Sequence, residues 1–428
     1  MAAIVLVIGF VLLLASGVPV AFAIGVAATL GLLLTLPADA ALATIAQRMA
    51  TGLDSFTLLA IPLFILAGQL MNRGGIARRL VDLARSLLAA APNGLAQVHI
   101  LANMLFGAIA GSAVAAASAV GGVMAARMEE EGYDRNVSAA VNVSSATVGL
   151  LIPPSNILII YSLASGGVSI AALFLAGYVP GMLVAAALMV AVAARRSGVP
   201  PRRARVRVRR ERRRALWAAL PSVLLPVLVI GGILGGVFTP TEAAAAAVLY
   251  AGALALFYGE IGWRDVPRIL LDSASTTSVV LSLIATSAAL SWVLSFLQVP
   301  QALSTALVGL SEDPVVVLLL INVVLLVVGT FLDMTPAVLV FTPILLPVVR
   351  ELGVDATHFG IVMILNLCIG LCTPPVGSVL FVGCSVARTG IEGVVRPLLP
   401  MYAAMIVVLM AVTFVPQLSL WLPRQLGF

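Results

Sequence analysis

Charged residues are scarce in this sequence: Asp, Glu, Lys and Arg together make up 10% of the 428 residues, against 61% hydrophobic residues. A soluble globular domain carries about 25% charged residues, so this chain cannot cover a water-facing surface of its own size. The shortage excludes soluble dinucleotide-binding enzymes, nucleic-acid-binding modules and disordered proteins. Because long apolar runs replace the short alternating segments of a β-barrel, the composition predicts an all-α polytopic membrane protein.

Further scarcities narrow the function. The chain has no lysine, and its 24 arginines lie in short clusters between apolar runs, a pattern that sets orientation in a membrane and does not indicate nucleic-acid binding. The three cysteines, Cys368, Cys372 and Cys384, share one apolar stretch, which predicts buried thiols and neither disulfides nor a zinc site. No HExxH, nucleophile elbow or P-loop occurs, so we expect no enzyme activity and no ATP hydrolysis by this chain.

Long apolar runs are what the chain has instead. A hydrocarbon core about 30 Å thick requires about 20 apolar residues per helix. The first run begins at Met1 without the positively charged segment of a signal peptide, so we expect a retained helix. Membrane-spanning helices are predicted over 2–17, 18–36, 54–72, 137–163, 169–194, 216–238, 242–258, 273–297, 358–386 and 398–420.

Two further apolar stretches, 94–128 and 313–349, are too long for one membrane crossing. Small or polar residues interrupt each stretch near its middle, at 110–112 and 328–330. We interpret both as re-entrant helical hairpins. Non-helical backbone at membrane depth is tolerated where protein or a watery cavity satisfies its hydrogen bonds.

The strongest arginine cluster lies in residues 195–214, which hold 11 arginines and one glutamate. Because arginine-rich loops stay on the cytoplasmic side, we predict a cytoplasmic linker there. Following the predicted spans from this linker places every arginine on the cytoplasmic side except Arg48, Arg350 and Arg424. A complete crossing by either hairpin would weaken this bias, which favours the re-entrant interpretation.

The linker separates two halves that repeat one pattern. Pro153-Pro154 recurs 221 residues later as Pro374-Pro375, and each pair follows a predicted hairpin. The first hairpin would open to the cytoplasm and the second outward, which is the inverted-topology repeat of secondary transporters. The first predicted repeat is 1–194, with scaffold helices in 1–72, the hairpin 94–128 and a broken helix 137–163; the second is 215–428, with scaffold helices in 216–258, the hairpin 313–349 and a broken helix 358–386.

Both Pro-Pro pairs lie inside runs long enough to span the membrane. Proline lacks an N–H and clashes with the preceding turn, at about 3 kcal/mol in a helix interior. A simple kink is the alternative, but the matching positions in two halves favour unwound helices. Freed carbonyl oxygens suit Na⁺, and the starts of half-helices suit a carboxylate. Polar side chains flank the breaks: Asn142, Ser144, Ser145, Thr147, Ser155 and Asn156 at the first, and Asn366, Thr373 and Ser378 at the second.

The hairpin tips carry the most informative polar residues. Ser112 in the first tip offers a hydroxyl ligand, although close packing would also explain the small residues around it. Asp333 in the second tip is an ionisable group at membrane depth, where a functional role is the default. It could instead cap the half-helix that begins at Met334. We predict that Asp333 coordinates a cation.

Other polar motifs favour structural roles. The Thr-Pro-Thr-Glu segment at 239–242 precedes an alanine-rich run and is typical of a capped helix start. His99 and His358 lie near predicted helix entrances without paired ligands in the sequence. We therefore assign neither histidine to a proton relay.

Several segments together resemble one transporter family. They are MLFGAIAGSAVAAASAVGGVM and LLIPPSNILIIYSLASGGVSIAALFLAGYVPGML within 104–186, VFTPTEAAAAAVLYA at 237–251, and GTFLDMTPAVLVFTPILLPV, HFGIVMILNLCIGLCTPPVGSVLFV and RPLLP within 329–400. Over essentially its whole length the chain resembles the large membrane (permease) subunit of TRAP (tripartite ATP-independent periplasmic) transporters.

This resemblance implies an elevator transporter of the ion transporter superfamily in the bacterial inner membrane. The implied activity is Na⁺-coupled uptake of an organic acid, such as a C4-dicarboxylate or a sialic acid. The implied partners are a four-helix small membrane subunit and a periplasmic substrate-binding protein. No cofactor is implied; Na⁺ serves as the coupling ion.

The same resemblance implies two sodium sites, each at a hairpin tip and the neighbouring helix break, with the substrate between them. Carried to this sequence, the sodium-site residues are Gly111, Ser112, Pro153 and Ser155 for the first site, and Gly329, Thr330, Asp333, Thr373 and Pro374 for the second. The substrate-site residues are Ser112, Ser145, Ser155, Asn156 and Gly377. Ala116 departs from the acidic residue that many members carry, so the first site would depend on hydroxyls and carbonyls alone.

Alternative functions stay open. A self-sufficient cation-coupled carboxylate symporter or antiporter of the same superfamily would need no binding protein. An intramembrane enzyme would need a nucleophile–base or metal pair at the bilayer midplane, and the sequence shows none. A passive channel would show no saturable, Na⁺-driven uptake. No arginine is predicted inside the membrane to hold an anion, so helix dipoles and Na⁺ would supply the positive field.

Overall fold

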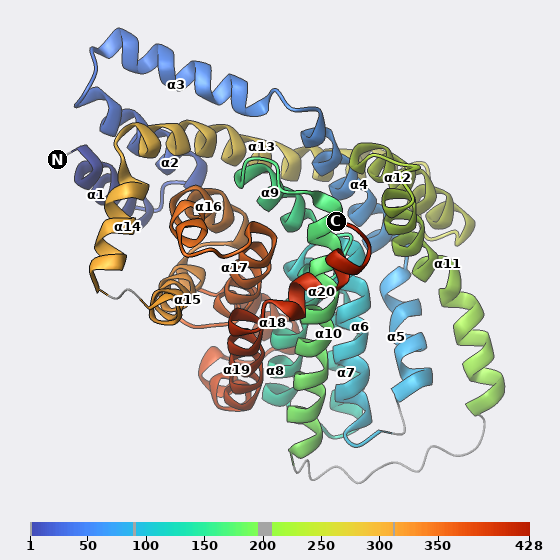
Figure 1. The fold of residues 1–428 in the computed structure, drawn as a ribbon. Helices are drawn as coiled ribbons and strands as arrows, with labels where there is room; N and C mark the ends of the chain where they lie inside the picture. Colours follow the sequence, from blue (N-terminus) through green and yellow to red (C-terminus); the bar gives the residue numbers. More distant parts are fainter. Residues whose placement is uncertain (1, 89–90, 196–207, 311–312) are drawn as a thin grey trace.

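The computed structural model describes residues 2–88, 91–195, 208–310 and 313–428. Every regular element in these ranges is a helix (Figure 1), which confirms the all-α prediction. Eight helical segments among them are long and apolar enough to cross a membrane, judged by length and composition. The helices are α1 (Ala2–Ala15), α2 (Val20–Leu33), α3 (Ala38–Leu53), η1 (Phe56–Leu59), α4 (Ala60–Arg73), α5 (Ile76–Leu88), α6 (Gly94–Ala110), α7 (Ala113–Glu130), α8 (Arg135–Ala146), η2 (Val148–Leu150), α9 (Asn156–Ala164), α10 (Ile170–Ala194), α11 (Val208–Leu234), α12 (Pro240–Phe257), α13 (Val266–Phe296), α14 (Val299–Leu310), α15 (Pro314–Phe331), α16 (Met334–Glu351), α17 (Ala356–Gly370), α18 (Ser378–Ala387), α19 (Ile391–Phe414) and α20 (Gln417–Gln425).

Both Pro-Pro pairs interrupt their helices. In the first half α8 ends at Ala146 and α9 begins at Asn156, with the short turn η2 between them. In the second half α17 ends at Gly370 and α18 begins at Ser378. Because proline cannot donate a backbone hydrogen bond, the helix does not continue through either pair. The two breaks are confirmed, and the alternative of a simple kink is wrong.

Each predicted hairpin consists of two helices separated by two residues. Gly111 and Ser112 join α6 to α7, and Leu332 and Asp333 join α15 to α16. Gly111 has a φ of 61°, a left-handed conformation that would strain a residue with a side chain, so a glycine ends α6 at this point. The helix pairs match the predicted segments, while their re-entrant course in a membrane stays a prediction.

Helix boundaries in the two halves recur at a spacing of 221 residues. α10 begins at Ile170 and α19 at Ile391, and Asp134 and Asp355 precede α8 and α17. The outer parts of the halves differ, because residues 54–59 separate α3 from α4 whereas α13 is one helix of 31 residues. The spacing agrees with the Pro-Pro repeat, and the inverted orientation of the halves stays a prediction.

The long helix α13 joins the two sides of the molecule. It packs against α2 and α3 as well as α4, and it also contacts α16 of the second hairpin. Figure 1 shows α3 and α13 side by side along one edge, with the hairpins and broken helices gathered beneath them. Buried side chains from both halves form one large hydrophobic core. The hairpins and breaks therefore share one packed body.

Some boundaries predicted from hydropathy are wrong. The predicted span 398–420 divides at Val415 and Pro416 into α19 and α20. The predicted span 273–297 begins earlier, at Val266, because α13 continues through polar residues into the segment before it. Hydropathy alone does not register these changes, since a proline can end a helix in an apolar run and a helix can extend beyond one.

The linker and three helices also differ from the prediction. Of the predicted linker 195–214, residues 196–207 lie outside the described residues, and Val208 already belongs to α11. The helices α3, α5 and α14 were not predicted. In α5 the arginines alternate with apolar residues, and one face packs against α6 and α11. Such a two-faced helix lacks the continuous apolar run on which the prediction rested.

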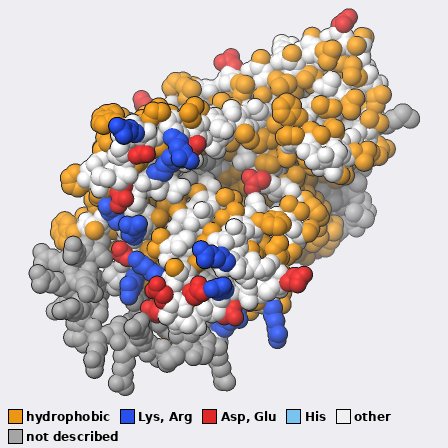
Figure 2. All heavy atoms as spheres, turned by 180° about the vertical axis from the view of Figure 1, so that it is seen from behind, with side chains coloured by type: hydrophobic (Ala, Val, Ile, Leu, Met, Phe, Trp, Pro, Cys, Tyr) orange, Lys and Arg blue, Asp and Glu red, His pale blue; other side chains and the backbone are white. Residues whose placement is uncertain are grey.

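Charged side chains occupy a limited part of the surface. Figure 2 shows arginines gathered over one region of the rear face, whereas the part of that face without them is largely hydrophobic. Several are paired within the protein, for example Arg127 with Asp82 at 3.2 Å and Arg79 with Glu260 at 3.8 Å. A charged region beside a broad apolar surface is the distribution expected of a protein embedded in lipid.

Polar caps begin helices in both halves. Thr239 and Glu242 form a reciprocal capping box at α12, which confirms the structural role predicted for that motif. Asp355 accepts hydrogen bonds from the backbone N–H groups of Thr357 at 2.8 Å and His358 at 3.1 Å. These bonds satisfy N–H groups that have no partner inside the helix, so the caps fix where the broken helices start.

Replacing Asp355 by Ala should lower the stability of the protein by about 1 kcal/mol, because two N–H groups of α17 lose their acceptor. The effect should appear as a lower apparent melting temperature of the purified protein. Asp355→Asn is the matched control, since asparagine caps a helix about as well as aspartate. Equal melting temperatures for the Ala and Asn variants would contradict the assigned role.

Candidate functional site

A cavity of about 100 Å³ lies where the two hairpin tips meet the two helix breaks. Ser112 and Asp333 stand 221 residues apart in the sequence, yet both line it. The lining residues are Gly111, Ser112, Ala113, Val114, Leu150, Ile157, Asp333, Met334, Leu371, Ser378 and Val379. Of the predicted site residues, Gly111, Ser112 and Asp333 are therefore brought together directly.

Four helices begin at this cavity. Its lining includes the first residues of α7, α16 and α18 and the second residue of α9. The N–H groups of a first helical turn lack partners inside their helix, and the helix dipole places about half a positive charge at each N-terminus. No arginine is among the described residues that line the cavity. Helix starts therefore supply its positive field.

The first tip is in contact with the first break. Ser112 is the N-cap of α7, and its hydroxyl oxygen accepts a hydrogen bond from the N–H of Ala115 at 3.3 Å. Asn156 at the start of α9 lies so close that a Cβ on Gly111 would stand 3.0 Å from its amide nitrogen. A glycine is thus needed at the tip for steric reasons as well as for its positive φ.

The second tip places its carboxylate beside the second break. Asp333 occupies the N-cap position of α16, but its side chain accepts no hydrogen bond from the backbone of that helix. Its Oδ1 accepts instead from the hydroxyl of Ser378, at 3.1 Å. The alternative of Asp333 as a side-chain cap is therefore wrong. The carboxylate joins tip and break and retains lone pairs for a further ligand.

A pair of glycines joins each hairpin to its broken helix. Gly107 of α6 lies against Gly149 of η2, and Gly329 of α15 lies against Gly370 of α17. A Cβ on Gly149 or Gly370 would come closer than 3.0 Å to the backbone of the facing glycine. Small residues allow backbones to approach this closely. The predicted site residue Gly329 therefore holds the second hairpin against its break.

Buried asparagine pairs provide a second link in each half. In the first, the side-chain amide of Asn103 donates to Asn142 Oδ1 at 3.1 Å and to Ser145 Oγ at 2.8 Å. In the second, the amide of Asn366 donates to Asn322 Oδ1 at 2.7 Å. The sequence interpretation missed Asn103 and Asn322, although each is a polar residue inside an otherwise apolar hairpin helix.

The two histidines extend these networks. His99 Nε2 lies 3.1 Å from Asn142 Oδ1, and His358 Nδ1 lies 2.7 Å from the hydroxyl of Ser419. The Oδ1 atoms of Asn103 and Asn366 have no hydrogen-bond partner among the described residues. Each half thus contains one buried amide oxygen that can accept a further hydrogen bond.

The two broken helices lie side by side. The thiol of Cys368 donates to the carbonyl of Thr147 at 3.4 Å, and the thiol of Cys372 donates to the carbonyl of Val143 at 3.3 Å. These bonds run from α17 and its break to α8 and the residue that follows it. All three cysteines are buried and free, as predicted.

The other predicted site residues lie around the cavity without lining it. The hydroxyls of Ser155, Thr330 and Thr373 each donate to a backbone carbonyl in their own segment. Ser145 belongs to the buried network described above, and Ala116 is completely buried. Pro153, Pro374 and Gly377 lie in the breaks themselves. A hydroxyl that donates one hydrogen bond still has lone pairs for a cation.

The ligand set of the cavity is made of oxygen atoms. Asp333 is the one carboxylate among the described lining residues, and Ser112 and Ser378 contribute hydroxyls. Nowhere in the described ranges do three or more His, Cys, Asp or Glu side chains form a group able to hold a metal ion. A single charge with neutral oxygens matches a weakly held monovalent cation better than a tightly bound divalent metal.

Comparison with known proteins places this geometry in context. The profile of a family described as "Tripartite ATP-independent periplasmic transporter, DctM component" matches residues 7–418. The chain is 55% identical over 425 residues to the uncharacterized protein YgiK of Salmonella typhimurium, covering 98% of this chain and 97% of that protein.

Two similar proteins carry a substrate in their names. The C4-dicarboxylate TRAP transporter large permease protein DctM of Pseudomonas aeruginosa is 40% identical over 379 residues, which are 87% of this chain and 88% of that protein. The sialic acid TRAP transporter large permease protein SiaM of Vibrio cholerae is 38% identical over 422 residues, covering 98% and 97% respectively.

A solved structure shares the fold. The crystal structure of the YdaH transporter of Alcanivorax borkumensis superposes with a TM-score of 0.66 over 90% of this chain and 89% of that one, at 15% sequence identity. At this identity the likeness concerns the arrangement of helices alone.

Proposed function

Because this chain belongs to the DctM family, the large permease component of TRAP transporters, we propose that it performs Na⁺-coupled uptake of a small organic anion. The chain is a multi-pass protein of the bacterial inner membrane. The observation that carries the proposal is the cavity in which four helix starts meet the carboxylate of Asp333. One polar cavity thus offers a positive field for an anion and a negative group for a cation.

The coupling ion would bind at the tips. At the second tip, Asp333 and backbone carbonyls near Thr373 and Pro374 would hold one Na⁺, with Ser378 positioning the carboxylate. At the first tip, Ser112 and carbonyls of the break at 153–155 would hold another without any carboxylate. Such a site should be the weaker of the two, because unit charges attract each other far more strongly than a charge and a dipole do.

The substrate would bind between the tips, at the starts of α7, α9, α16 and α18. A carboxylate there can accept hydrogen bonds from free backbone N–H groups, which is how helix N-termini bind anions. The named relatives carry a C4-dicarboxylate and sialic acid, both of which are carboxylates. We infer that the cargo of this chain is an organic acid of the same class.

Transport would move the cavity as one unit, in the manner of an elevator. In each half the glycine contact and the buried asparagine pair tie the hairpin to its broken helix. We infer that these four segments travel together against a scaffold formed by α1–α4 and α11–α14. A four-helix small membrane subunit would steady the scaffold, and a periplasmic binding protein would deliver the substrate, in keeping with the tripartite description of the family.

Uptake by the reconstituted transporter tests this function. Proteoliposomes containing the chain, its small subunit and its binding protein should accumulate labelled succinate or sialic acid in a saturable manner, and only with Na⁺ outside. Equal uptake without Na⁺ would contradict the coupling. Full uptake by the chain alone would favour a self-sufficient carboxylate symporter of the same superfamily.

A further inference from the structure

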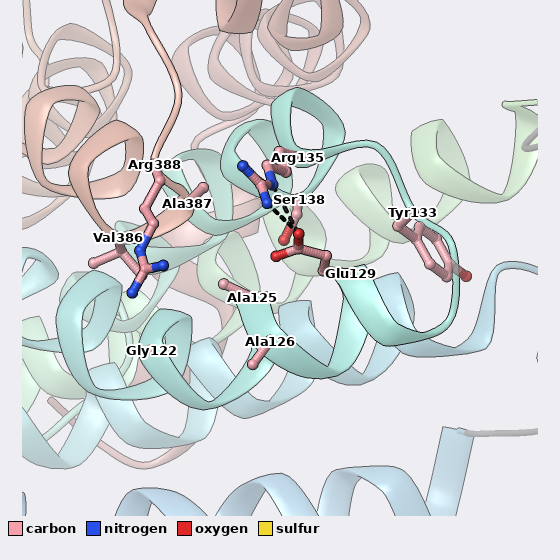
Figure 3. Close-up of a pocket in the computed structure, with 10 residues that line it drawn as sticks. All are labelled: Gly122, Ala125, Ala126, Glu129, Tyr133, Arg135, Ser138, Val386, Ala387 and Arg388. Atoms are coloured by element: carbon pink, nitrogen blue, oxygen red, sulfur yellow. Dashed lines mark hydrogen bonds and ion pairs between the residues drawn. The ribbon is translucent and has the colours of Figure 1, made fainter.

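A second and larger cavity, of about 200 Å³, lies at the other ends of two helices that line the first. It is bordered by the C-terminal half of α7, the start of α8 and the end of α18 (Figure 3). Its lining residues are Gly122, Ala125, Ala126, Glu129, Tyr133, Arg135, Ser138, Val386, Ala387 and Arg388. All of its charged residues belong to segments that the arginine distribution places on the cytoplasmic side.

Two guanidinium groups face this cavity, and one of them has no partner. Arg135 donates from Nε to Glu129 Oε1 at 2.9 Å and forms an ion pair with the same carboxylate through Nη2. The guanidinium of Arg388 has no hydrogen bond or ion pair to any described residue. Figure 3 shows it pointing into the space above α7, on the same side as Arg135. The two arginines and one glutamate leave a net positive charge.

The surroundings keep this charge accessible and uncompensated. A Cβ on Gly122 would meet no atom within 4 Å, so the wall formed by α7 is open there. Ala125 and Ala126 add only methyl groups. Tyr133 adds no negative charge, because burial, reinforced by the nearby Glu131, raises the pKa of its phenol. An incoming anion would therefore meet donors and no competing carboxylate except Glu129.

The backbone of Arg388 is unusual for an arginine. Arg388 is the C-cap of α18 with a φ of 54°, in the left-handed region that glycine or asparagine adopts at lower energy. Strained backbone at a polar cavity points to a role for the side chain. Here the left-handed residue ends α18 and places a guanidinium at the cavity.

The two cavities are connected through the same helix pair. α7 and α18 pack against each other, and both begin at the first cavity and end at the second. With ten residues in α18, the ends lie on the order of 15 Å apart at 1.5 Å per residue. An anion that leaves the first cavity along this pair would reach Arg388.

We propose that the second cavity is an exit site for the cargo, where Arg388 and Arg135 bind the carboxylate of an organic acid released from the first cavity. This inference rests on the proposed transport function. A guanidinium binds a carboxylate or a phosphate through two parallel hydrogen bonds. The site should be weak, since an exposed ion pair contributes little in water. Weak binding suits an exit site, because the cargo must leave it quickly.

Protection of Arg388 from an arginine-specific reagent tests binding directly, without requiring transport. The protein in phosphatidylcholine nanodiscs is treated with phenylglyoxal, and modification of the Arg388 and Arg396 peptides is measured by mass spectrometry. Succinate at about ten times its dissociation constant should slow modification of Arg388 about tenfold, because only the anion-free fraction reacts. Inorganic phosphate should protect as well. Arg396, an exposed arginine outside the cavity, should react at an unchanged rate.

Two outcomes of this assay would overturn the proposal. One is equal reaction rates at Arg388 with and without succinate. The other is protection that occurs only when phosphatidylglycerol is added to the nanodiscs, since the cavity would then hold a lipid headgroup rather than a soluble acid.

Transport by the reconstituted three-component system tests the exit role. In proteoliposomes oriented with the binding protein outside, succinate inside should inhibit uptake by occupying the exit site. Arg388→Asn, which suits a left-handed residue, should raise the internal concentration for half-inhibition about two- to fivefold, as expected from losing one exposed ion pair. The external concentration for half-maximal uptake should not change.

Arg396→Asn is the matched control, with the same loss of charge on the same predicted side. Identical internal half-inhibition in the wild type, Arg388→Asn and Arg396→Asn would refute the exit site while leaving the proposed transport function intact. Absence of Na⁺-driven uptake by the wild type would instead reject the transport function.

Discussion

Replacing Asp333 by Asn should raise the Na⁺ concentration for half-maximal uptake about 100-fold. Asparagine keeps a side-chain oxygen and nearly the same shape, so the change removes mainly the negative charge. Two unit charges about 4 Å apart attract each other by about 4 kcal/mol at an effective dielectric constant of 20. Losing most of that attraction corresponds to about two orders of magnitude in affinity, at about 1.4 kcal/mol per factor of ten.

The position of Asp333 explains why the effect should concern Na⁺ in particular. Its Oδ1 is held by Ser378 across the gap between tip and break, and its side chain caps no N–H of α16. The substitution should therefore leave the start of the helix unchanged. Uptake should recover at saturating Na⁺, because the substrate-binding helix starts do not depend on the carboxylate.

Labelled succinate uptake into proteoliposomes, measured over a range of Na⁺ concentrations, checks this result. Asp313→Asn is the matched control, because Asp313 caps the same hairpin at the start of α15, where it accepts from the N–H of Val315 at 2.9 Å. That variant should have the Na⁺ dependence of the wild type. An unchanged half-saturation in Asp333→Asn would remove the carboxylate from the coupling mechanism.

The breaks and the tips could be predicted from the sequence because their causes are local. Two consecutive prolines remove hydrogen bonds within their own helix, whatever packs around them. The glycine at 111 and the aspartate at 333 contradict the apolar runs in which they stand, so the interruption is visible in the chain itself. The 221-residue spacing then indicated that both sets belong to one repeated unit.

The contacts that assemble the cavity could not be predicted in the same way. The bond from Ser378 to Asp333 depends on where α18 packs relative to α16, and the bond from Asn103 to Asn142 depends on how two apolar helices cross. Neither partner is marked in the sequence by spacing or composition. Helices such as α5 were missed for another reason: one apolar face pays no signal to a search for unbroken apolar runs.

Gly149→Ala should have the second large effect, with a loss of stability of about 3 kcal/mol and of most uptake. A methyl group at Gly149 would come closer than 3.0 Å to the backbone of Gly107, which has no side chain that could move aside. Overpacking of this kind costs about 1–3 kcal/mol and more where backbone must shift. The displacement would fall between the first hairpin and its break, so the tip at Ser112 would move relative to the cavity.

The matched pair of variants separates this effect from a general cost of adding a methyl group. Gly370→Ala makes the same clash against Gly329 in the second half and should be equally harmful, whereas Gly231→Ala in α11 meets no atom within 4 Å and should be neutral or slightly stabilising. The measurements are the apparent melting temperature and Na⁺-driven uptake of each purified variant. Because the clash joins tip to break in both halves, loss of uptake should exceed what the unfolded fraction explains. If Gly149→Ala and Gly231→Ala behaved alike, the glycine contacts would not be what holds each hairpin against its broken helix.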